Sequence, residues 1–143
     1  TNDFAYPLDS YAKTCALVTG EKNYSIQLAM RHGHIFGFPE FFVFIDQYCK
    51  GGIPMPTVFK PTITDGQMTA SVRTETKLVS ARLHYTTEPH AANKDRKWVT
   101  TNLRIGDVRV SGAAPPENAT VWFVDLKDAR GVVTSSELIV TTN

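Results

Sequence analysis

The chain has 143 residues, of which 42% are hydrophobic and 20% charged, and its formal net charge is +1. This composition excludes a disordered or collagen-like chain and fits one or two small globular domains. The near-neutral charge gives no electrostatic reason to expect nucleic acid or an anionic membrane surface as a partner. No apolar stretch approaches the roughly 20 residues that span a bilayer. The first residues carry no signal-peptide pattern.

The chain first predicts a short amphipathic helix. Pro7 suits a first helical turn, and Asp9 suits its positive end. Apolar residues then recur at helical spacing on one face, and they are Leu8, Tyr11, Ala12 and Cys15. Gly20 ends the segment. We expect Cys15 and the other cysteine, Cys49, to be small buried hydrophobic residues, because two cysteines are too few for a disulfide framework.

A strand and a second helix are predicted next. Apolar residues alternate with polar or small ones over 24–30, which is the periodicity of a strand. Pro39 then opens a helix that Gly51 and Gly52 close. The apolar residues of 41–48 cover more than one face of that helix, so we expect it to be almost wholly buried.

Beyond the proline-rich linker at 53–56, the pattern predicts strands only. Alternating runs end at turn signals such as Asp65-Gly66, and the run 121–124 is apolar on both faces, as in a central strand. These features predict an antiparallel β-sandwich of the immunoglobulin or fibronectin III kind over 57–143, with Trp122 in its core. With the helices of residues 1–52, the overall fold class is α+β.

The first part of the chain also has an order that suits hydrolytic chemistry: acidic residue, helix, strand, histidine, helix. In serine hydrolases of the α/β class, a histidine takes the proton of a serine hydroxyl while a carboxylate fixes its tautomer. Loops at the carboxyl ends of neighbouring parallel strands bring both groups to one edge of the sheet. Asp3 and the motif His32-Gly33-His34 occupy the corresponding places.

The segments TNDFAYPLDSY, MRHGHIFGFPEFFVFIDQY and KGGIPMP resemble the C-terminal end of α/β-hydrolases of the acetyl xylan esterase, dienelactone hydrolase and prolyl-oligopeptidase-like group. The segments ARLHYTT, RKW and VWFVDLKDARGVVTSSE resemble the β-sandwich that some members add. The resemblance implies that Asp3 is the acid of a catalytic triad and His34 its base, with His32 as the second choice. It also implies that residues 1–52 are the last part of a catalytic domain.

The family's nucleophile motif, G-x-S-x-G, is absent from the sequence. We therefore expect the chain alone to be inactive, although the resemblance implies an ester or acyl substrate for the parent enzyme, with acetylated polysaccharide as one candidate. The alternative is a non-catalytic β-sandwich that binds a ligand or has a structural role. The family's polysaccharide-degrading members favour a location outside the cytoplasm. No cofactor is expected.

Other candidate sites are weaker. His32 and His34 could share one face of a strand and bind a metal, but a third ligand is missing, because His84 and His90 lie in the sandwich. Trp98 could stack against a sugar. Asn118-Ala119-Thr120 fits the glycosylation pattern, and in a bacterial chain it is only a turn.

Assembly is predicted from the unpaired strand and the apolar helix. A strand at 24–30 without covalent neighbours would expose a pairing edge. The apolar residues of 41–45 would lack a sheet to cover them. We therefore expect a homodimer or larger assembly built through residues 1–50.

Overall fold

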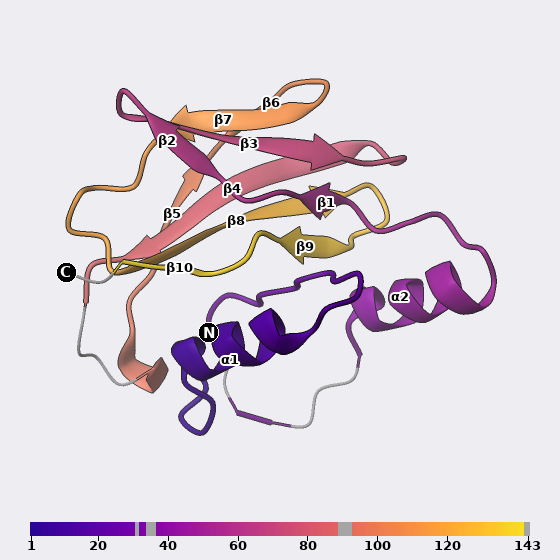
Figure 1. The fold of residues 1–143 in the computed structure, drawn as a ribbon, viewed down its shortest axis with the longest axis horizontal. Coiled ribbons are helices and arrows are strands. Elements are labelled where there is room, and N and C mark those ends of the chain that lie inside the picture. The colour runs from indigo at the N-terminus through magenta and orange to yellow at the C-terminus, as the bar shows by residue number, and fades with distance from the viewer. Residues whose placement is uncertain (31, 34–36, 89–92, 142–143) are drawn as a thin grey trace.

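The computed structural model describes residues 1–30, 32–33, 37–88 and 93–141. Two antiparallel sheets form its centre, and a layer of two helices with extended segments lies against one of them (Figure 1). The helices are α1 (Leu8–Leu17) and α2 (Pro39–Cys49). A 3-10 turn, η1 (Asn93–Asp95), is the only other helical element of the described residues.

The first sheet has the order β1-β3-β7-β6, with β2 also paired to β3. Its strands are β1 (Thr57–Val58), β2 (Thr62–Thr64), β3 (Gln67–Arg73), β6 (Arg104–Ile105) and β7 (Arg109–Ala113). The predicted turn at Asp65-Gly66 joins β2 to β3, and both residues have positive φ, 49° and 72°. This pair of angles is what a two-residue hairpin loop requires.

The second sheet has the order β10-β8-β4-β5, with β9 also paired to β8. Its strands are β4 (Leu78–Thr86), β5 (Val99–Asn102), β8 (Val121–Asp128), β9 (Val133–Ser135) and β10 (Ile139–Val140). In Figure 1 this sheet is the middle layer, with the first sheet above it and the helices below.

Strand β8 carries core residues on both faces. Trp122, Val124 and Leu126 pack between the two sheets together with Met68 and Val110, which are fully buried. The predicted core position of Trp122 is confirmed, because only 4% of its surface is exposed. A strand of eight residues with seven buried therefore needs cover on both sides, and the layer of residues 1–55 supplies the second cover.

That second cover is a small cluster centred on Phe123. Leu8 of α1 and Ile26 are buried there against Val121, Phe123 and Leu138. Burying a side chain such as Leu8 or Ile26 contributes roughly 1.5–3 kcal/mol. The N-terminal segment is therefore attached to the second sheet by its own apolar contacts.

The interpretation of residues 1–52 as an α/β-hydrolase remnant is wrong. All strand pairs of the described residues are antiparallel, and none of these strands lies before residue 57. Of the strand expected at 24–30, only Tyr24 makes a ladder contact, a single bridge to Ser135. The alternation in this segment instead places Ile26 against the outer face of the second sheet. The α+β class built on that remnant is corrected to a mainly antiparallel β fold.

Helix α2 begins at Pro39 as predicted, but the expectation that it is buried is wrong. Phe41 is 54% exposed and Phe42 58% exposed, and Glu40 is the only buried residue of the helix. The Glu40 carboxylate accepts a hydrogen bond from the backbone N–H of Val133 at 2.6 Å, which attaches the first turn of α2 to β9. None of the described helices is long and apolar enough to cross a bilayer.

Candidate functional site

The first residues of the chain lie beside residues 27–30. The amino group of Thr1 donates to the carbonyl of Gln27 at 2.9 Å, and the N–H of Asn2 donates to the carbonyl of Met30 at 2.9 Å. The side-chain amide of Asn2 also donates to the carbonyl of Arg96 at 2.9 Å, which connects these two segments to the loop before β5. These contacts bring Asp3 next to the loop that carries His32.

Asp3 sits in a local turn that fixes its carboxylate. Its Oδ1 accepts hydrogen bonds from the N–H groups of Ala5 at 2.7 Å and Tyr6 at 3.3 Å. Desolvation raises the pKa of Asp3, but these backbone donors and the His32 imidazole together hold it below its ordinary value. Asp3 is therefore an ionised carboxylate at neutral pH, held by its own backbone turn.

His32 faces this carboxylate through its Nδ1 atom, which lies 3.0 Å from Asp3 Oδ2. When Nδ1–H donates to a carboxylate, the neutral imidazole keeps its lone pair on Nε2. His32 Nε2 has no hydrogen-bond partner within the described residues. The His32 side chain is 40% exposed.

Two aromatic rings hold the imidazole in place. The Phe4 ring centroid is 4.9 Å from that of His32, and the Tyr6 ring is stacked on it at 6.0 Å. Both aromatic residues are largely exposed on their other sides, 69% and 68%. Sequence reasoning missed this role of Phe4 and Tyr6. The only signal was their position within three residues of Asp3.

The choice between the two histidines stays a prediction. Asp3 pairs with His32, the second choice from the sequence, while His34 lies outside the described residues. His90 also lies outside them. Within the described part of the chain, no group of three His, Cys, Asp or Glu side chains is arranged to hold a metal. Cys15 and Cys49 are free thiols, and the expectation that both are buried is wrong, because Cys15 is half-buried and Cys49 is exposed.

A second histidine network lies inside the second sheet, and the sequence did not indicate it. His84 Nε2 is 2.8 Å from Asp125 Oδ2, and its Nδ1 is 2.8 Å from Thr100 Oγ1. Arg82 donates to both oxygens of Asp125, at 3.0 and 2.7 Å. Both ring nitrogens of His84 have partners and the ring is fully buried, so this network stabilises the sheet rather than offering a base to a substrate.

The other residues that the sequence singled out, Trp98 and the turn at 118–120, make contacts within the fold. Trp98 is half-buried and packs edge-on against Phe123, with ring centroids 5.5 Å apart. Asn118 is exposed in a turn, and the Thr120 hydroxyl donates to the carbonyl of Thr86. Neither arrangement forms a ligand site.

Comparison with known proteins adds little. No family model matches the chain, and no curated protein matches it. Among solved structures, pectate lyase Pel3 from Pectobacterium carotovorum is similar with a TM-score of 0.36 and 15% identity, over 62% of this chain and 27% of that one. A likeness of this size carries no argument about fold or function.

Proposed function

We propose that Asp3 and His32 are the acid and base of a hydrolytic site that acts on an ester or acyl substrate. The observation that carries the proposal is the contact of Asp3 Oδ2 with Nδ1 at 3.0 Å, which leaves Nε2 as the proton acceptor. A carboxylate in this position fixes the tautomer of the imidazole and stabilises the imidazolium that forms during reaction.

The nucleophile of this site comes from outside the described residues. No serine or threonine hydroxyl of the described part is hydrogen-bonded to His32. A hydroxyl supplied by further chain of the same gene product, or by a partner, would meet Nε2 on the open side of the ring. The pair by itself has no group that can form an acyl intermediate.

The test compares variants of the longest product of the gene in an assay of p-nitrophenyl acetate hydrolysis. We expect His32→Ala to lower kcat by at least about a hundredfold, and Asp3→Asn to lower it strongly because the amide no longer selects the tautomer. His34→Ala is the matched control from the same loop, and we expect nearly unchanged kinetics. Loss of activity in His34→Ala with retention in His32→Ala would assign the base to His34 and contradict the proposal.

The second candidate is a non-catalytic binding or structural module. The sequence favours it, because the G-x-S-x-G nucleophile motif is absent and the Asp3–His32 pair alone cannot form an acyl intermediate. Equal hydrolysis rates for the wild type, His32→Ala and Asp3→Asn would leave this module as the function of the chain.

A further inference from the structure

A groove of about 570 Å³ lies between the helical layer and the edges of both sheets. Its lining comes from segment 21–24, the end of α2, the linker at 54–56, strand β1, the turn at 73–75 and strand β9. We call it the α2–β1 groove. Its volume is in the range of small-ligand sites. The groove shares no residue with the Asp3–His32 pair, so ligand binding in it does not depend on the proposed hydrolytic site.

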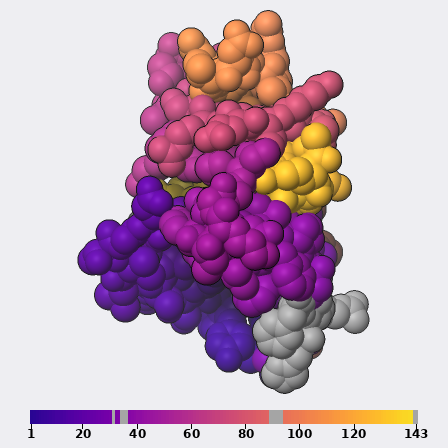
Figure 2. Space-filling model, turned by 90° about the vertical axis from the view of Figure 1, so that its right-hand side faces the viewer, coloured from indigo at the N-terminus to yellow at the C-terminus, as the bar shows by residue number. Residues whose placement is uncertain are grey.

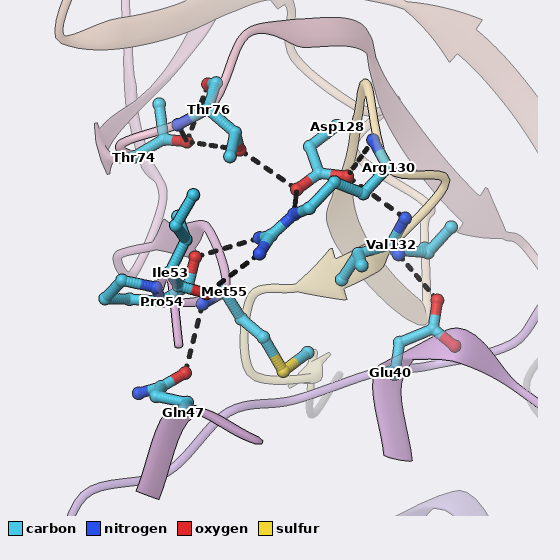
Figure 3. Close-up of polar contacts among 11 residues, drawn as sticks. Glu40, Gln47, Ile53, Pro54, Met55, Thr74, Thr76, Asp128, Arg130 and Val132 are labelled. Carbon is cyan, nitrogen blue, oxygen red and sulfur yellow. Dashed lines mark hydrogen bonds and ion pairs between the residues drawn. The ribbon is translucent and has the colours of Figure 1, made fainter. Parts of the chain in front are cut away.

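The linker wall of the groove is held rigidly. Arg130 donates to the carbonyls of Ile53 at 2.8 Å and Pro54 at 2.9 Å, and its Nε is 2.8 Å from Asp128 Oδ2 (Figure 3). The N–H of Met55 donates to Gln47 Oε1 at 3.0 Å, which joins the same linker to α2. In Figure 2 the purple surface that contains α2 and the linker meets the yellow surface of the C-terminal strands.

The opposite wall is fixed as well. The N–H of Ser135 donates to the carbonyl of Tyr24 at 2.7 Å, and the Ser135 hydroxyl accepts from the N–H of Ile26 at 2.9 Å. Both walls are therefore formed before any ligand arrives. A preformed site loses little conformational entropy on binding.

Two aromatic rings of the groove lining, Tyr48 and Phe59, are about half exposed. Tyr48 is 50% exposed and Phe59 is 47% exposed, although each contacts other groups of the lining. The Tyr48 hydroxyl donates to Glu21 Oε2 at 3.0 Å, and this hydrogen bond raises the pKa of Tyr48. The Arg73 guanidinium lies 6.0 Å from the centroid of the Phe59 ring. Each half-exposed ring is thus accompanied by a charged group.

The charges of the lining balance. Its acidic residues are Glu21 and Glu75, and its basic residues are Lys22 and Arg73. A ligand of strong net charge would meet one unfavourable partner for each favourable one. A neutral ligand with many hydroxyl groups can donate to the carboxylates and accept from the cations.

We propose that the α2–β1 groove binds a neutral oligosaccharide. Sugar rings present apolar C–H faces that suit the faces of Tyr48 and Phe59, and their hydroxyls suit the charged groups of Glu21 and Arg73. Proline-rich peptides also dock in grooves lined by aromatic residues. Charged groups of both signs around the rings favour a ligand rich in hydroxyls, so the peptide is an alternative outcome of the test.

The test is an NMR titration of the 143-residue chain with neutral oligosaccharides from glucan, xylan and mannan at millimolar concentration. We expect at least one of them to shift amide signals of segment 21–24, the linker, β1 and β9. No shift with any neutral oligosaccharide, or shifts elsewhere only, would overturn the proposal. Preferential binding of an anionic oligogalacturonate or a proline-rich peptide in the groove would overturn the ligand class.

Variants separate the contributions. We expect Tyr48→Ala and Phe59→Ala each to weaken binding by about tenfold, and Tyr48→Phe to retain most of the affinity because the ring remains. Phe42→Ala removes an equally exposed ring of α2 that does not line the groove, and binding should not change. Unchanged affinity in the Tyr48 and Phe59 variants would contradict this mode of binding.

Discussion

Replacing Asp125 by alanine tests the buried network of the second sheet. The substitution removes the acceptor of two hydrogen bonds from Arg82 and one from His84. The Asp125 side chain is only 3% exposed and His84 is fully buried, so water cannot replace the lost partner of His84. Breaking one partner of a buried charged network costs about 3–5 kcal/mol. For a chain of this length, that loss lowers Tm by roughly 10–15 °C.

Urea unfolding monitored by tryptophan fluorescence measures this loss, with Asp107→Ala as the control. Asp107 is an exposed aspartate without a polar partner among the described residues, and its removal should change the unfolding free energy by about 0.5 kcal/mol or less. A loss below about 1 kcal/mol in Asp125→Ala would refute the reasoning, because a satisfied buried network cannot be removed at so small a cost.

The same carboxylate gives a pH dependence with a definite sign. Burial raises the pKa of Asp125, but the hydrogen bonds from His84 and Arg82 outweigh it and the net pKa is lowered. A lowered folded-state pKa stabilises the fold above the unfolded pKa of about 4, and this contribution is lost as pH falls through the folded value. Urea titrations should therefore show a steeper loss of stability below about pH 4 in the wild type than in Asp125→Asn.

Three further outcomes are expected. Trp122→Ala should cost roughly 3–5 kcal/mol in urea unfolding, and a loss under about 1 kcal/mol would mean that the indole is not packed in the core. Arg130→Ala should speed hydrogen exchange of the Met55 amide, because the linker loses both of its side-chain donors; unchanged exchange would show that Gln47 alone holds this segment. We also propose a homodimer or larger assembly through residues 1–50, which sedimentation velocity at micromolar concentration should detect and which Phe41→Ser with Phe42→Ser should weaken. A wild-type monomer would contradict it.

The sequence predicts elements well where a local rule decides them. Pro39 starts α2, the Asp65-Gly66 pair forms the β2–β3 loop, and the doubly apolar run 121–124 lies in a central strand with Trp122 in the core. The immunoglobulin or fibronectin III assignment of the two sheets stays a prediction.

The sequence predicts poorly what covers an apolar face. Apolar residues do alternate over 24–30, but Ile26 packs on the face of the second sheet and the segment does not pair as a strand. The same alternation can arise from pairing within a sheet or from packing onto one. The apolar residues of α2 predicted a buried helix, but no other part of the described chain covers them. Of the candidate site, the resemblance named Asp3 and His34, with His32 only as the second choice, whereas the ring contacts of Phe4 and Tyr6 depend on tertiary geometry.

The contact of Arg130 with residues 53 and 54 has a consequence for how this protein can vary. Both of its linker hydrogen bonds go to main-chain carbonyls, which every amino acid supplies. We therefore expect the side chains at 53 and 54 to be free to change, whereas a change at Arg130, or at Asp128 that anchors it, should remove or weaken these hydrogen bonds. The linker and the Arg130 turn are hydrogen-bonded to each other, yet their substitutions would then not be correlated. In an alignment, this contact would be visible only as a conserved arginine at position 130 beside variable residues at 53 and 54.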